Sequence, residues 1–173
     1  MTVKLIQDLT AELQKLSGLS VATPQTSTLT TADPRNAAGV MEVELDFVEV
    51  DRLSCALREL RLNVPSMSQA APDLLKDWAE ALCKRITYLL ENMAPVEFEP
   101  VSGQVLIRST TPTQQPGRRL FYEVLLHANA AGNFSLKRYE SIQGQPGRTG
   151  VDLQLTHEVL ARLVRDLVET IPL

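Results

Sequence analysis

The segment from Ala71 to Met93 constrains the fold more than any other part of this sequence. Its nonpolar residues recur at spacings of three and four, which places them on one side of an α-helix: Leu74, Leu75, Trp78, Leu82, Ile86, Leu89, Leu90 and Met93. Pro72 suits the first turn of a helix, whereas Pro95 cannot continue one. The pattern therefore predicts a long amphipathic helix that ends near Asn92 or Met93 and packs against a core.

Two further helices are predicted near the two ends of the chain. Residues 3–17 carry a narrow nonpolar stripe: Ile6, Leu9, Leu13 and Leu16. A stripe this narrow is typical of a helix that contacts a partner or lies across a domain, so Leu9 and Leu13 are candidate partner-binding residues. The helix near the C-terminal end of the chain has Thr156 as its N-terminal cap, a wide nonpolar side, and Pro172 at its end.

Alternating residues predict a sheet. From Met41 to Phe47 every second residue is nonpolar and the others are acidic, which is typical of a half-buried strand. Residues 52–64 fit a strand or a helix, and the alternation that leads to Pro65 favours a strand. The nonpolar residues of this segment change sides near Arg58 and Glu59, which predicts a β-bulge there.

Short strands separated by turn residues follow the central helix. The strands are Val96–Val101, Gln104–Thr110, Arg119–Ala128 and Asn133–Ile142, and the turns are Ser102–Gly103, Pro112–Gly117 and Asn129–Gly132. They predict an antiparallel meander, and Val151–Leu155 forms either a last strand or an extended entry to the final helix. The predicted fold is α+β, with an antiparallel sheet of about five to six strands and three helices, in the order α-ββ-α-βββ(β)-α.

A Ser/Thr-rich segment separates the first helix from this sheet. Residues 20–38 show no sustained period, which indicates a loop or a mobile linker. The predicted organisation is an N-terminal helix over residues 1–19, the linker over 20–38, and a single α+β domain over 39–173.

Composition excludes several classes of protein. A net charge of −4 and an isoelectric point near 5.2 argue against a general nucleic-acid binder. The sequence has no nonpolar run long enough to span a membrane and no secretory signal, so we expect a soluble cytoplasmic protein. Cys55 and Cys83 lack the spacing of a metal or redox motif, so we interpret both as small buried nonpolar residues.

No motif in the sequence predicts catalysis, a cofactor or a metal. The two histidines are His127 and His157, and Ala161 stands where a zinc-peptidase H-E-x-x-H motif needs its second histidine. The acids of the first strand, among them Glu42 and Asp46, alternate as the exposed side of an ordinary strand does. The prediction therefore leans away from an enzyme.

Two groups of residues are candidate binding sites. Phe121, Leu125 and Tyr139 make the second side of the meander partly nonpolar, so we expect the N-terminal helix, a partner, a second copy of the chain, or a loop to cover it. Basic residues in and beside the Gly/Pro-rich loops are candidate contacts for an anion, since arginine suits carboxylates: Arg118, Arg119, Lys137, Arg138 and Arg148.

The predicted organisation resembles that of the class I type III secretion chaperones and related bacterial domains. The shared features are a small acidic α+β domain, a helix at each end, a long helix between two groups of strands, and no catalytic motif. The sequence differs from that organisation in residues 20–38 and in the extra meander strands. It implies a homodimer that binds an extended segment of another protein along its sheet or grooves. The alternative is a small-molecule or anion-binding, enzyme-like domain, with Arg118, Arg119 and Arg148 at the mouth of a pocket between sheet and helix. This pocket would hold at least two of His127, His157 and the loop arginines.

Overall fold

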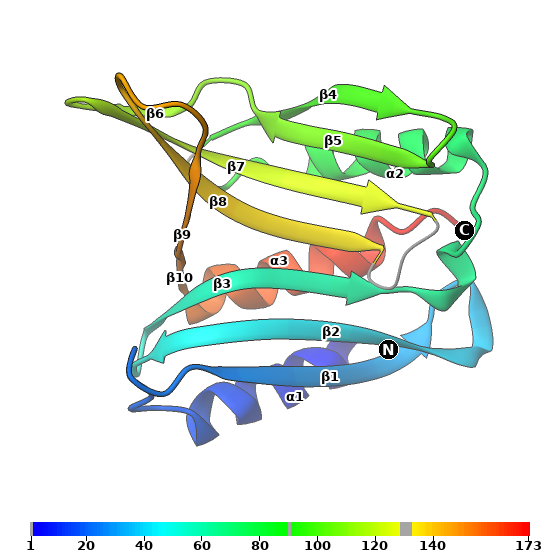
Figure 1. Ribbon diagram of the computed structural model, residues 1–173. Coiled ribbons are helices and arrows are strands. Elements are labelled where there is room, and N and C mark those ends of the chain that lie inside the picture. The colour runs from blue at the N-terminus through cyan, green and yellow to red at the C-terminus, as the bar shows by residue number, and fades with distance from the viewer. Residues whose placement is uncertain (1, 90, 129–132) are drawn as a thin grey trace.

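The computed structural model describes residues 2–89, 91–128 and 133–173, which form three α-helices and ten strands (Figure 1). The helices are α1 (Thr2–Lys15), α2 (Pro72–Arg85) and α3 (His157–Glu169). The strands are β1 (Gln25–Asp33), β2 (Asn36–Val50), β3 (Ser54–Asn63), β4 (Met93–Glu99), β5 (Gln104–Ser109), β6 (Thr113–Gln115), β7 (Arg118–His127), β8 (Phe134–Ile142), β9 (Thr149–Val151) and β10 (Leu153–Thr156). The α+β class is confirmed, but the expected five to six strands are too few.

The strands form one open antiparallel sheet in the order β1-β2-β3-β8-β7-β5-β4. Strands β3 and β8 pair with each other over only three residues of each, and β10 pairs with the rest of β3 while β9 pairs with the rest of β8. Figure 1 shows α1, α2 and α3 on the same side of the sheet, which we call the inner side. No helix of the described residues lies on the opposite, outer side.

The sheet confirms several predicted details. Residues 54–63 form a strand, as the alternation favoured. The four strands predicted after the central helix correspond to β4, β5, β7 and β8, which form an antiparallel meander. Leu45 pairs with Leu60 and Phe47 pairs with Leu57, so β3 has one residue more than β2 between these pairs. This extra residue is the bulge predicted near Arg58 and Glu59. The cap of the last helix is also confirmed, since the Thr156 hydroxyl accepts a hydrogen bond from the backbone of Val159.

The linker predicted over residues 20–38 is wrong. Strand β1 lies within it and pairs with β2 along its length, with Leu29 buried on the inner side. The strand is mostly Ser and Thr, and Thr favours strands because its branched side chain suits a pleated surface. Nonpolar periodicity therefore missed it.

Helix α1 is part of the same hydrophobic core as the rest of the chain. Leu9 is 0% exposed and Leu13 is 3% exposed, and both belong to the core cluster that also contains α3. The narrow stripe therefore packs within the chain, against α3 and β1. The prediction that Leu9 and Leu13 bind a partner is contradicted, because a partner has no access to them.

Helix α2 is shorter than predicted, because it ends at Arg85. Ile86 and Leu89 are still buried, but in non-helical chain, and Met93 already belongs to β4. The run of Ile, Thr and Tyr after Arg85 has low helix propensity. Met1, Leu90 and the predicted turn at Asn129–Gly132 lie outside the described residues.

Candidate functional site

The outer side of the sheet carries the polar residues that alternate with the buried core. Three acids and one arginine form a cluster there on β2 and β3: Glu44, Asp46, Glu59 and Arg61. The Arg61 guanidinium donates to Asp46 Oδ2 and Glu44 Oε2, each at 2.7 Å, and to Glu59 Oε2 at 2.9 Å. One cation thus joins carboxylates from neighbouring strands, which makes this part of the sheet strongly polar.

Asp46 couples this cluster to pH. Partial burial acts to raise the pKa of Asp46, but hydrogen bonds from Arg61 and Thr26 outweigh it and lower the pKa. A lowered pKa stabilises the fold above the pKa of the unfolded chain, about 3.9, and this contribution is lost as the pH falls through the lower value of the folded state.

We therefore expect Asp46→Asn to lower the free energy of unfolding at pH 7 by at most about 1 kcal/mol, since solvent weakens partly exposed pairs. The difference in free energy of unfolding between the variant and the wild type should become smaller as the pH is lowered toward 3, because protonation removes the same charge from Asp46 in the wild type. Urea unfolding at several pH values measures it, with Glu42→Gln as the control for loss of an acid from the same strand. A difference that stays constant with pH would contradict the prediction.

A second cluster lies on β5, β7 and β8 around Glu123, which is 8% exposed. Arg108 donates to Glu123 Oε2 through Nε at 3.2 Å and Nη2 at 3.1 Å. Arg148 donates to both carboxylate oxygens, to Oε1 through Nη2 at 2.8 Å and to Oε2 through Nη1. Beside them, the rings of Phe121 and Tyr139 stack with their centroids 5.9 Å apart.

The two guanidiniums also pack on these rings. The Arg148 guanidinium carbon lies 4.1 Å from the centre of the Tyr139 ring, and that of Arg108 lies 5.5 Å from the centre of the Phe121 ring. Arg148 belongs to the loop between β8 and β9, so this loop of the chain itself covers the Tyr139 ring. Leu125, on the same side of β7, is half-buried. Of the coverings expected for this side, the structure shows a loop over part of it, whereas the N-terminal helix α1 lies on the inner side.

The arginines predicted to contact an anion do not converge. Arg118 donates to Glu140 and Gln115, whereas Arg148 lies on Glu123. Arg118 and the exposed Arg119 line a hollow of about 400 Å³ whose lining does not include Arg148. Two of the three arginines therefore already have carboxylate partners.

The remaining basic residues of that group are also separated. Arg138 lies on the inner side against Glu91 and over the ring of Tyr122. Lys137, the residue before Arg138, lies on the outer side, where its Nζ is 3.9 Å from Glu59 Oε2. No common anion site is formed by these two residues and the loop arginines, all of which the structure describes.

The two histidines lie apart in the fold. His127 pairs with Gln104 at the end of β7, and its burial lowers the pKa of its imidazole. His157 begins α3, with its Nε2 3.1 Å from the carbonyl oxygen of Ser54. A hollow of about 370 Å³ between α1 and the β2–β3 turn includes His157 and Arg52 but not His127. The pocket that the enzyme-like alternative requires is therefore not assembled from these residues.

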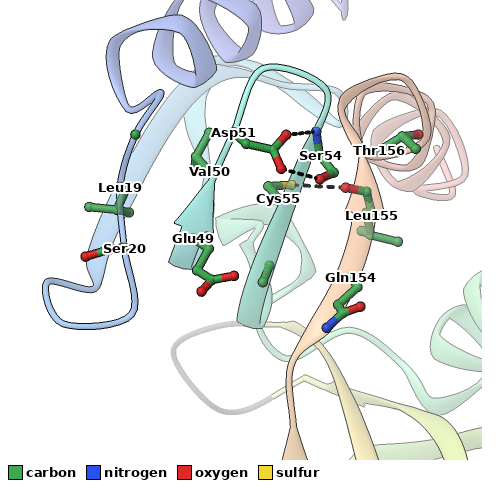
Figure 2. Close-up of a pocket in the computed structure, with 12 residues that line it drawn as sticks. Leu19, Ser20, Glu49, Val50, Asp51, Ser54, Cys55, Gln154, Leu155 and Thr156 are labelled. Atoms are coloured by element: carbon green, nitrogen blue, oxygen red, sulfur yellow. Dashed lines mark hydrogen bonds between the residues drawn. The ribbon is translucent and has the colours of Figure 1, made fainter.

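A larger hollow of about 540 Å³ opens at the β2–β3 end of the sheet, with Leu19 and Ser20 on one side and Gln154 and Leu155 on the other (Figure 2). Cys55 lines it, and burial, followed by the nearby charge of Asp51, raises the pKa of its thiol to about 12. The group is therefore a neutral thiol at pH 7, which is a poor nucleophile.

Asp51 lines the same hollow and is held by local hydrogen bonds. Its carboxylate accepts from the backbone N–H groups of Leu53 and Ser54, at 2.8 and 2.7 Å, and from the Ser54 hydroxyl at 2.9 Å. These bonds lower the pKa of Asp51. It is thus an ionised carboxylate that organises the turn, and the hollow lacks an activated nucleophile and base among its lining residues, all of which are described.

The two edges of the sheet differ in their side chains. Strand β4, at one edge, contains Pro95, Glu97 and Glu99, and its register with β5 is irregular between Pro95 and Glu97. Prolines, charges and bulges are the usual means by which proteins prevent further strands from pairing with an edge. Strand β1, at the other edge, has no charged residue and no proline from Gln25 to Ala32, and its register with β2 is unbroken there.

The β1 edge is a candidate binding surface that sequence reasoning missed, because it lies in the predicted linker. On the outer side of this strand Thr28 and Thr30 are exposed, while Ser27 and Leu29 point inward and are buried. The signal that identifies the strand is a run of β-branched threonines around Leu29. Its backbone donors and acceptors on the side away from β2 face no other strand of the described sheet.

Comparison with family models, with curated proteins and with solved structures gives no significant match to this chain. Within residues 2–89, 91–128 and 133–173, no helix has both the length and the nonpolar character needed to span a membrane. The same residues contain no group of three or more His, Cys, Asp or Glu side chains arranged to hold a metal ion.

Proposed function

We propose that this chain is a non-catalytic protein-binding domain, chaperone-like or adaptor-like, which takes up an extended segment of another protein at the edge of β1. The observation that carries the proposal is the open edge itself: the eight residues Gln25–Ala32 form regular strand without the charges, proline or bulge that interrupt β4. Such an edge pairs readily with a further strand, because its unpaired N–H and C=O groups form a template.

The dimensions of the edge suit an extended peptide. The eight residues Gln25–Ala32, at about 3.3 Å each, offer about 26 Å of backbone. Main-chain hydrogen bonds supply affinity in this mode of binding, and alternate side chains of the added strand supply specificity. The uncharged threonines of β1 impose no charge requirement on the added strand, so a chaperone-like protein with this edge accepts segments of varied sequence.

The other candidate surfaces support binding less well. The predicted nonpolar sheet side is partly covered by the loop that carries Arg148, and Arg61 with its acids makes the rest polar. The enzyme-like alternative loses support because Arg118 and Arg148 are paired with carboxylates. The resemblance of the sequence to class I type III secretion chaperones favours the same proposal, since these chaperones bind an extended segment of another protein.

Two further parts of the proposal concern assembly and location. The alternative occupant of the β1 edge is the β1 strand of a second copy of the chain. Pairing of the two β1 strands would form a homodimer. Cys55 and Cys83 are both free, and we propose a cytoplasmic protein because disulfides are frequent in secreted proteins and rare in the cytosol.

A double lysine variant of β1 tests the edge. Thr28→Lys with Thr30→Lys adds two charges at exposed positions, where lysine opposes the approach of another strand. We expect partner binding to weaken by about tenfold or more, which is about 1.4 kcal/mol, with little change in stability. The control is Val96→Lys with Val101→Lys, which adds the same charge at exposed positions at and beside β4, on the other edge.

The measurement has three parts. Affinity capture from lysate identifies proteins that the wild type and the control retain and the β1 variant loses. Hydrogen exchange on a captured complex is expected to show new protection in β1. Size-exclusion chromatography with light scattering tells a second copy from another protein. Equal binding by the β1 variant and the control, or a complex without protection in β1, would refute the proposal.

A further inference from the structure

We propose that Glu123, Tyr139 and Phe121 form a binding site for an arginine side chain of a partner protein, which the chain's own Arg148 occupies in the free state. The site lies on the outer side of the meander and does not involve the β1 edge. It is therefore a second recognition site, distinct from the one in the proposed function.

The contacts of Arg148 define what the site recognises. Its two terminal nitrogens face the two oxygens of Glu123, and its guanidinium lies on the Tyr139 ring at 4.1 Å from the ring centre. A carboxylate that accepts both arms of the fork selects a planar guanidinium over an ammonium group. An aromatic face on one side of it adds a cation–π contribution. Together these groups form a receptor for arginine.

The receptor is built on rigid strands and is nearly complete without Arg148. Glu123 is opposite Arg108 on β5, and Phe121 is opposite Tyr139 on β8. Arg108 holds one Glu123 oxygen, and the Phe121 ring stacks against the Tyr139 ring. The carboxylate and the ring are thus held in position by three hydrogen-bonded strands, so the site is preorganised.

Arg148, in contrast, belongs to a loop suited to release it. Residues 143–150 are all exposed, and Gly144 and Gly147 have positive φ values of 83° and 78°. The Arg148 side chain itself is 37% exposed, whereas the Glu123 side chain is 9% exposed. Rotation of one side chain vacates the site without disturbing the strands, and the buried Glu123 is then left with only Arg108 as a partner.

A partner's arginine must compete with a tethered one. A ligand for a site that is open only part of the time binds more weakly in proportion to the open fraction. If Arg148 occupies the site for about nine-tenths of the time, its removal raises the affinity for an external arginine about tenfold. Arg148 therefore acts as an internal competitor that restricts the site to segments whose arginine is held there by additional contacts.

Titration with short peptides, followed by NMR, tests the proposal. The probes are acetyl-Gly-Arg-Gly-amide and its Lys and Gln counterparts, and the proteins are the wild type, Arg148→Ala and Arg165→Ala. Arg165 is exposed on α3, on the other side of the sheet, so its replacement controls for the loss of one positive charge. We expect Arg148→Ala to bind the Arg peptide about tenfold more tightly than the wild type and Arg165→Ala do.

Two additional variants make the result specific to the site. Glu123→Gln and Tyr139→Leu, each combined with Arg148→Ala, are expected to abolish the gain, and the Lys and Gln peptides should bind Arg148→Ala more weakly than the Arg peptide. Thermal unfolding identifies which double variants fold, and either one suffices. Equal affinity of Arg148→Ala and the wild type, or a gain that persists in a folded double variant, overturns the proposal. Neither outcome bears on the β1 edge, because β1 is unchanged in all these proteins.

Discussion

Replacing Leu9 with Glu is expected to unfold the protein or to lower its free energy of unfolding by about 4 kcal/mol or more. Leu9 is 0% exposed and lies in the core between α1 and its neighbours α3 and β1. The change removes a buried nonpolar side chain and inserts a carboxylate that has no partner there. Both effects disfavour the folded state, which for a domain of this size is stabilised by only about 5–15 kcal/mol.

Urea unfolding followed by circular dichroism measures this effect. Val3→Glu is the matched control, since it places the same charge on the same helix at a residue that is 70% exposed, and it should leave the stability nearly unchanged. A Leu9→Glu protein as stable as the wild type, but with a changed oligomeric state, would restore the helix-as-interface interpretation that the narrow stripe suggested.

Removal of the Asp166 carboxylate is expected to produce the second large loss of stability. Asp166 is a buried acid on α3, and it accepts hydrogen bonds from Arg85 Nε at 3.0 Å and from the Tyr88 hydroxyl at 2.7 Å. Arg85 is the last residue of α2, and Tyr88 lies in the non-helical segment that follows this helix. Asp166 therefore holds the chain after α2 against α3.

We expect Asp166→Ala to lower the free energy of unfolding by about 2–4 kcal/mol, since it leaves the partly buried Tyr88 hydroxyl without its acceptor and the Arg85 guanidinium with Glu169 as its remaining acceptor. The lower end of this range reflects the partial exposure of Arg85, which lets water replace the lost bond. Urea unfolding gives the value, and Asp77→Ala, which removes an exposed acid from α2, is the control.

The ionisation of Tyr88 supplies an independent measurement. Burial, followed by the hydrogen bond to Asp166 and its negative charge, raises the pKa of Tyr88. Without Asp166 this pKa should fall, which ultraviolet absorbance at high pH detects as earlier ionisation of one tyrosine. If the pKa and the stability both stay at their wild-type values, Asp166 does not hold Tyr88 as the structure describes.

Local patterns predicted the elements whose burial alternates in a simple way. The period of two in Met41–Phe47 and in the meander predicted β2, β5, β7 and β8, because these strands bury one side against the helices. The change of sides near Arg58 and Glu59 predicted the bulge for the same reason, since an extra residue shifts every later side chain to the opposite side. These features are encoded within a few neighbouring residues.

Other features depend on which segments meet in space. Ile86 and Leu89 continue the helical spacing of α2, and only their contact with the rest of the core decides that they are buried outside a helix. The stripe containing Leu9 looks like an interface, and whether it meets another chain or its own core depends on α3 and β1. Arg148 and Glu123 are 25 residues apart, so no local pattern indicates that the loop closes over the sheet.

By itself, the sequence determined the α+β class, three helices and the antiparallel meander, and it contains no recognised catalytic motif. These features could be predicted because residue spacing, helix caps and turn residues act between residues that are close in sequence. The tertiary structure decided that the threonine-rich segment is an edge strand, that α1 belongs to the core, and that Arg148 fills a site on the outer side. Each of these depends on pairing or burial between residues distant in sequence. An edge, a covered surface and an occupied receptor exist only once those residues have been brought together.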